Sequence, residues 1–94
     1  ELITFSAVVE DSTSPEIALD YADTLIRQYN LMANMQDNTI KLGSKDSYGG
    51  LYDKYDILIG VSPQSNTDNQ DEWYIFDAII SGTHRKIKLQ KAYT

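Results

Sequence analysis

Few residues in this chain have the types and spacing that catalysis or metal binding requires, and His84 is the first to consider. It is the only histidine, and there is no cysteine. A Ser-His-Asp arrangement would have to be built around this imidazole, and one histidine without cysteine excludes ordinary zinc spacing. We interpret His84 as an exposed basic residue after the end of an element, beside Arg85 and Lys86. The sequence therefore predicts no catalytic residue, no cofactor and no enzymatic activity.

Three aspartates, Asp46, Asp53 and Asp56, supply the oxygen ligands that calcium prefers. Their spacing lacks the alternating acids, the central glycine and the terminal glutamate of an EF-hand loop. Gly49-Gly50 is not followed by a helical pattern, so its amides have no helix end from which to bind a phosphate. We expect a solvated acidic hairpin with no metal or nucleotide site.

The same segment contains the best local candidate for a binding surface. Tyr48 and Tyr52 are interleaved with Asp46, Asp53 and Asp56. Tyrosine gives a large contact area with only two side-chain torsions to freeze, and interface hot spots are enriched in it. Acidic residues beside the rings would steer a basic partner. We predict that this hairpin contacts a protein.

The first two predicted elements of the chain are a strand and a helix. Apolar and polar residues alternate over 3–9, which is the two-residue period of a strand with one buried face. Ser14 followed by Pro15 and an acidic first turn predicts the start of a helix. The apolar stripe of that helix continues to about Gln36.

Three further strands are expected. Residues 39–42 form a short one, 55–61 a longer one, and the glycine-containing segment 43–50 joins them as a hairpin. Residues 85–93 close the chain as a strand with Lys86 and Lys88 on the outward face. In this register Lys41, Lys86 and Lys88 share the open face of the sheet, where they discourage edge pairing or contact an acidic surface.

The segment 71–81 supports two structures. Its large apolar residues are β-branched or aromatic types that strands prefer. On a helical wheel, one stripe collects the residues Trp73, Ile75, Phe76, Ile79 and Ile80. Gly82 then suits a helix C-terminus, so we predict a helix. The alternative is a strand that turns at Ser81-Gly82.

Together these elements predict one α+β domain over residues 1–94. The preferred order is β-α-β-β-α-β, a ferredoxin-like split βαβ fold with a four-stranded antiparallel sheet and two helices on one face. If 71–81 is a strand, the order resembles that of cystatins, with an antiparallel meander wrapped around a single helix. Ninety-four residues are enough for only one core.

Composition limits the function. The net charge of −6 disfavours nucleic acids and anionic lipid as partners. No apolar run approaches the ~18 residues of a membrane span, and a first residue other than methionine leads us to expect that upstream residues have been removed. The predicted function is a non-enzymatic protein-interaction module, in concrete form an acidic inhibitor or immunity-type protein with a basic partner.

A second class of function also fits the composition. The alternative is a small exported toxin or effector, or a viral or phage structural subunit, that forms a homo- or hetero-oligomer through strand edges. The excess of ten Asp over four Glu, with abundant Asn, Ser, Thr and Tyr, favours a secreted or virion-associated location.

Overall fold

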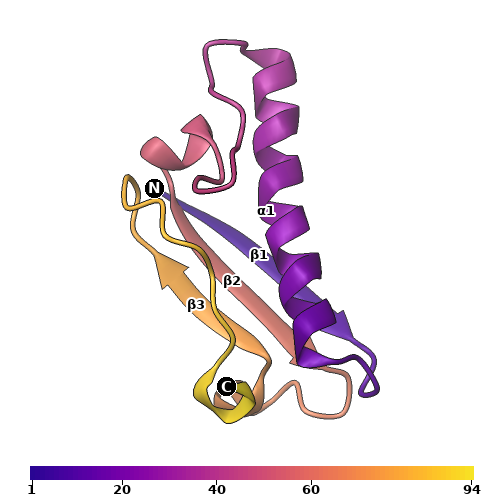
Figure 1. Ribbon diagram of the computed structural model, residues 1–94. Helices are drawn as coiled ribbons and strands as arrows, with labels where there is room; N and C mark the ends of the chain where they lie inside the picture. The colour runs from indigo at the N-terminus through magenta and orange to yellow at the C-terminus, as the bar shows by residue number, and fades with distance from the viewer.

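One long helix packs against a three-stranded sheet (Figure 1). The computed structural model describes residues 1–94. The elements in chain order are β1 (Leu2–Val9), α1 (Pro15–Gln36), β2 (Asp56–Pro63) and β3 (Ile75–Ile79), with short 3-10 turns at Gly50–Asp53, Gln70–Glu72 and Lys91–Tyr93. The helix is not apolar enough along its length to cross a membrane.

The central strand of the sheet is β2. It pairs in parallel with β1, from Leu2 opposite Asp56 to Val9 opposite Pro63. It pairs antiparallel with β3 over five residue pairs. A parallel neighbour requires a long crossover connection, and α1 with the loop after it supplies this connection. With backbone partners on both sides, β2 is the most buried strand, consistent with its apolar sequence.

Local sequence determines both ends of α1. The Ser14 side chain accepts a hydrogen bond from the backbone N–H of Ile17 at 3.2 Å, and Pro15 occupies the first turn. The helix ends at Gln36, where the N–H of Asp37 bonds to the carbonyl of Ala33. The predicted start and end of this helix are therefore confirmed.

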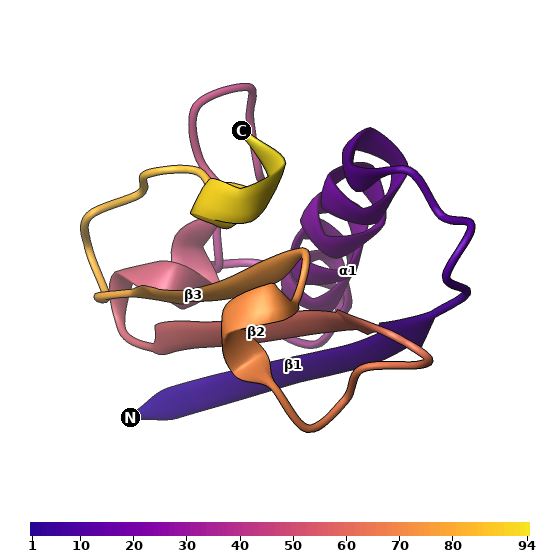
Figure 2. The same cartoon turned by 90° about the horizontal axis from the view of Figure 1, so that it is seen from below.

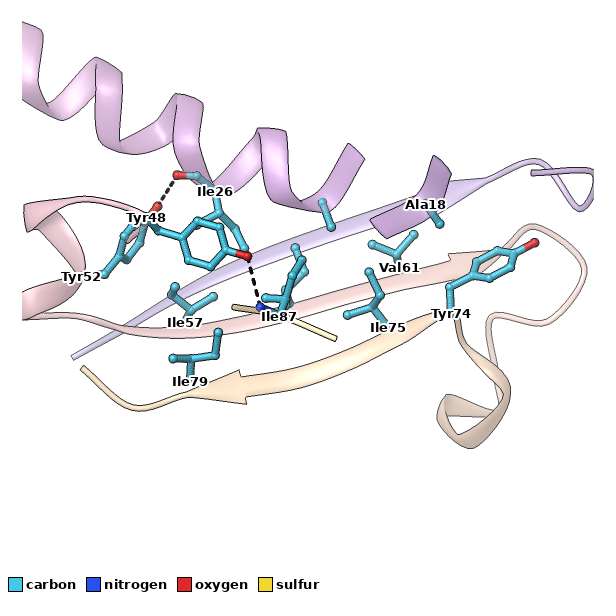
Figure 3. Packing of buried hydrophobic residues seen from close by; sticks show 12 residues of the cluster. Ala18, Ile26, Tyr48, Tyr52, Ile57, Val61, Tyr74, Ile75, Ile79 and Ile87 are labelled. Carbon is cyan, nitrogen blue, oxygen red and sulfur yellow. Dashed lines mark hydrogen bonds between the residues drawn. The ribbon is translucent and has the colours of Figure 1, made fainter. Parts of the chain in front are cut away.

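The core lies between α1 and one face of the sheet, and the C-terminal segment covers the same face (Figure 2). Ala18, Ala22 and Ile26 face it at helical spacing. Two tyrosine hydroxyls reach backbone groups in this layer (Figure 3): the Tyr52 hydroxyl donates to the Ile26 carbonyl at 2.7 Å, and the Tyr48 hydroxyl accepts the N–H of Ile87 at 3.1 Å. Buried polar groups are thus satisfied inside an apolar core.

The predicted helix over 71–81 is wrong. Residues 75–79 form β3, and only Gln70–Glu72 make a 3-10 turn. Ile75 and Ile79 enter the core, whereas Phe76 and Ala78 lie on the opposite face. Pairing with β3 satisfies the second edge of the buried strand β2, which a helix would leave without backbone partners.

The strands expected at 39–42 and 85–93 are absent, so the four-stranded ferredoxin-like fold and the cystatin-like meander are both wrong. Side chains replace the sheet bonds of the first segment: Asn34 donates to the Ile40 carbonyl at 2.7 Å, and Asn30 donates to the Lys41 carbonyl at 3.0 Å. The C-terminal segment makes one backbone bond beside β3, from the N–H of Gln90 to the carbonyl of Tyr74, the residue before that strand. Ile87 is buried, but it belongs to an irregular segment and not to a strand.

Candidate interaction surface

The two tyrosines expected in a contact surface lie in the core. Tyr48 is 2% exposed and Tyr52 is 3% exposed, and their rings meet edge to face at 6.5 Å. The Arg27 guanidinium lies 5.0 Å from the centre of the Tyr48 ring. Burial raises the pKa of Tyr48 to about 12 and raises the pKa of Tyr52 as well. Both rings therefore stabilise the fold and are not exposed to a partner.

The three aspartates of the same prediction do not form one patch with these rings. Asp46 is exposed in the loop before Tyr48. Asp53 is exposed and contacts His84. Asp56 begins β2 and accepts the N–H of Ser81 at 2.7 Å, which fixes the turn after β3. A binding role for the aspartates remains a prediction.

The lysines expected on the open face of the sheet lie elsewhere. Lys41 is in the loop after α1, and Lys86 and Lys88 are in the irregular C-terminal segment; all three are exposed. The predicted lysine face does not exist, because neither segment is part of the sheet. The alternating register instead places on that face the residues Leu2, Thr4, Ser6, Val8, Leu58, Phe76 and Ala78.

A serine, a histidine and an aspartate meet beside the Gly49-Gly50 pair. Ser47 Oγ lies 3.2 Å from His84 Nδ1, and His84 Nε2 is in close contact with Asp53 Oδ1. The three residues line a cavity of about 410 Å³. His84 is partly buried rather than exposed as predicted, and it is the only residue other than glycine with a positive φ, at 55°.

The arrangement differs from a hydrolase triad in two ways. In serine hydrolases the serine meets Nε2 and the carboxylate meets Nδ1, whereas here the two nitrogens are exchanged. Ser47 Oγ also accepts the N–H of Gly49 at 3.1 Å, so this amide is not free to stabilise an oxyanion. We interpret the cluster as a structural contact that joins the C-terminal segment to the loop before β2.

The outer edge of β1 is the feature best suited to binding. The Glu1 carbonyl accepts the N–H of Asp56, and the Val9 carbonyl accepts the N–H of Gln64, the residue after β2, both at 2.8 Å. The backbone groups of the odd-numbered residues of β1 therefore point toward β2. Because strand residues alternate, the N–H and C=O groups of the even-numbered residues point to the opposite, unpaired side. These residues are Leu2, Thr4, Ser6 and Val8.

Nothing in β1 protects this edge. Its eight residues, LITFSAVV, include no charge, no proline and no glycine, and these are the usual means by which proteins prevent edge pairing. The edge of β3, by contrast, is partly covered: the Arg85 guanidinium donates to the Ala78 carbonyl, and just before the strand the N–H of Gln90 donates to the Tyr74 carbonyl, both at 2.8 Å. The unprotected edge is therefore that of β1.

An apolar groove lies next to the start of this strand, between β1 and the second half of α1. It has a volume of about 360 Å³ and is lined by residues of β1, α1 and the loop before β2: Ile3, Tyr29, Met32, Ala33, Gln36, Leu51 and Tyr55. The Tyr29 ring meets the ring of Phe5 edge to face at 5.6 Å. No charged side chain lines the groove, so it suits an apolar group.

Charge is divided unevenly along the chain. Residues 1–26, which include β1 and the first half of α1, contain six acidic residues and no lysine or arginine; residues 27–94 contain eight of each kind. The whole net charge of −6 therefore comes from the part of the chain that contains the open edge.

Comparisons with protein-family models, with curated proteins and with solved structures gave no match. The geometry of the open edge, the groove beside it and the distribution of charge are therefore the basis on which a function is inferred.

Proposed function

We propose that this chain is a non-enzymatic protein-interaction module that binds a basic protein by adding one of the partner's strands to the edge of β1. The observation that carries the proposal is the uncharged, unpaired outer edge of this eight-residue strand. An acidic inhibitor or immunity-type protein is the concrete form, because the acidic half of the chain complements a basic enzyme.

Strand addition uses groups that are already in place. The even-numbered residues of β1 each offer one N–H and one C=O, and a net gain of about 0.5–1.5 kcal/mol per hydrogen bond adds up along the strand. The strand is already ordered by its pairing with β2, so the ordering cost falls on the partner's segment.

The proposal is tested with peptides selected from a displayed random library on the folded protein. Ser6→Pro is the key variant, because the Ser6 N–H faces outward and proline there removes an edge donor without removing a bond to β2. Ser6→Val keeps the N–H and is the matched control. We expect Ser6→Pro to abolish binding of the selected peptides and Ser6→Val to retain it.

Amide exchange locates the binding site. In the free protein the amides of Leu2, Thr4, Ser6 and Val8 should exchange fast, and those of the odd-numbered residues between them slowly. A bound strand should slow the first set. Peptides that bind Ser6→Pro as well as the parent protein and protect no amide of β1 would overturn the proposal.

The non-enzymatic part is tested at Ser47, the one nucleophile that contacts the histidine. The protein and Ser47→Ala are incubated with a fluorophosphonate and with an activated ester. We expect no covalent labelling and the same slow hydrolysis by both proteins. Labelling of Ser47 with loss of ester hydrolysis in the alanine variant would show an enzyme instead.

A further inference from the structure

We infer that the segment bound at β1 is an extended strand with basic residues at its ends and an apolar side chain that enters the groove beside Tyr29 and Met32. The inference rests on the proposed function and specifies the chemistry of the partner.

The position of the groove relative to the open edge supports the apolar part of this inference. A strand added to β1 would lie about 4.8 Å from it, with alternate side chains directed to the helix-covered face. On that face Ile3 lines the groove together with Tyr29 and Met32 of α1. A side chain of the added strand opposite Ile3 would therefore extend into the groove.

The groove wall is adaptable and accessible. Met32 is 59% exposed although it lines an apolar groove. Methionine is flexible and polarizable, and such side chains are common on surfaces that accept different apolar groups. An added apolar side chain would bury Met32 without displacing a residue of the core.

The distribution of charge supports the basic ends. Glu1 stands before β1, and Glu10 and Asp11 follow it, so acidic residues flank both ends of the uncharged strand. Lysine or arginine at both ends of the added strand would lie beside these acids. The complete absence of basic residues from 1–26 leaves the acids at the two ends of β1 without a nearby basic residue in the same part of the sequence.

The same charges disfavour a second copy of the chain as the occupant. Antiparallel pairing of two β1 strands centred on Ser6 would place Glu1 of one copy opposite Asp11 of the other. Like charges opposite each other destabilise a strand pair, and two acidic halves would approach. A basic partner avoids both costs.

The test uses three synthetic probe peptides, measured by fluorescence anisotropy. The first alternates valine and threonine between pairs of lysines; the second has glutamates in place of the lysines; the third has serines in place of the valines. We expect only the first to bind well, and its affinity to fall when the Debye length is reduced from about 10 Å to about 3 Å by salt.

Two variants of α1 separate the groove from general charge effects. Met32→Asp places a charge in the groove, and Met35→Asp places the same charge one turn away on a side chain that is 78% exposed and does not line the groove. We expect Met32→Asp to weaken binding of the lysine-flanked peptide about tenfold, the effect of losing one partly buried methionine contact. Met35→Asp should change it less than about twofold.

The outcomes distinguish this inference from the proposed function. The inference would be overturned if Met32→Asp and Met35→Asp weakened binding equally, or if the glutamate-flanked peptide bound as well as the lysine-flanked one. Loss of binding in Ser6→Pro would still support edge pairing in that case. If Ser6→Pro has no effect on any peptide that binds, the proposed function fails too. A dimer in sedimentation experiments that is lost in Ser6→Pro would identify a second copy as the occupant and overturn the inference.

Discussion

Substitutions at Asn30 and Gly49 should have strongly non-additive effects on the free energy of unfolding. Asn30 is 1% exposed; its Nδ2 donates to the Lys41 carbonyl and its Oδ1 accepts the N–H of Leu51, both at 3.0 Å. This one side chain therefore attaches the loop before β2 to α1, including Leu51 of the apolar groove.

The magnitudes follow from these contacts. Asn30→Ala leaves the Leu51 N–H without a partner and removes one of the two hydrogen bonds to the Lys41 carbonyl, which keeps the N–H of Gly50. At about 1–3 kcal/mol for the unpaired donor and about 1 kcal/mol for the second bond, we expect a loss of about 3 kcal/mol in the free energy of unfolding. A Cβ on Gly49 would lie 2.0–2.4 Å from Asn30 side-chain atoms, and its φ is 121°. Gly49→Ala should thus displace Asn30 and add backbone strain of about 1–2 kcal/mol, for a total of about 4–5 kcal/mol.

The double substitution should cost little more than Gly49→Ala alone. Once Asn30 is alanine, the new methyl group meets no amide, and only the backbone strain remains to be added. The summed single losses would be about 7–8 kcal/mol against about 4–5 kcal/mol for the double variant, which is a coupling of about 3 kcal/mol.

The free energies of unfolding of the parent protein, the two single variants and the double variant are measured by urea unfolding at constant m-value. An osmolyte is added to all of them if Gly49→Ala is too unstable to fold alone. Gly82→Ala is the matched control, because Gly82 has a φ of 83° but its Cβ would meet nothing within 4 Å. Gly82→Ala should therefore lose only the free energy of the backbone strain. Losses at Asn30 and Gly49 that add within about 0.5 kcal/mol would refute the proposed contact.

Three further results are expected. Burial raises the pKa of Tyr48 to about 12 and raises the pKa of Tyr52 as well. The stabilising effect of the two buried tyrosines is therefore complete below their unfolded pKa of about 10 and is lost as pH rises toward the folded values, by up to about 1.4 kcal/mol per pH unit for each tyrosine. Tyr52→Phe should reduce the slope of the urea midpoint against pH, and an unchanged slope would contradict this. His84→Ala should lower stability by about 1 kcal/mol more than His84→Gly, because glycine adopts the φ of 55° without strain; equal thermal midpoints would refute that reasoning. Gly60→Ala should cost about 1–3 kcal/mol and change the fluorescence of Trp73, because the new Cβ would lie 2.8 Å from the indole ring; an unchanged emission spectrum would show that the ring does not pack there.

The helix and the first strand could be predicted because their signals are local. Ser14, Pro15 and the apolar stripe that follows specify α1 from contacts within one or two turns. Alternation over 3–9 specifies β1, and the observed strand extends it by one residue. Neither prediction depends on which neighbour the element meets.

The segment that became β3 was misinterpreted because a spacing of four residues is ambiguous. Ile75 and Ile79 share one face of a helix, but they also share one face of a strand. Phe76 and Ile80, which complete the helical stripe, are exposed in the structure. The need of β2 for a second backbone partner decided between the two patterns.

The candidate sites were beyond local reasoning for a related reason. His84 and Asp53 are 31 residues apart, and no local pattern connects them. The groove joins residues of β1, α1 and the loop before β2, so it exists only once these segments pack. The tyrosines show the converse, since a pattern typical of a binding surface lies in the core.

Local sequence was enough to predict where the long helix begins and ends, which residues of the first strand face inward, and how charge is distributed along the chain, because each depends on neighbouring residues alone. Tertiary structure decided how many strands form, which edge of the sheet stays open and which polar side chains meet. These depend on how backbone hydrogen bonds are shared among segments distant in the sequence, and that competition is resolved only when the whole chain packs.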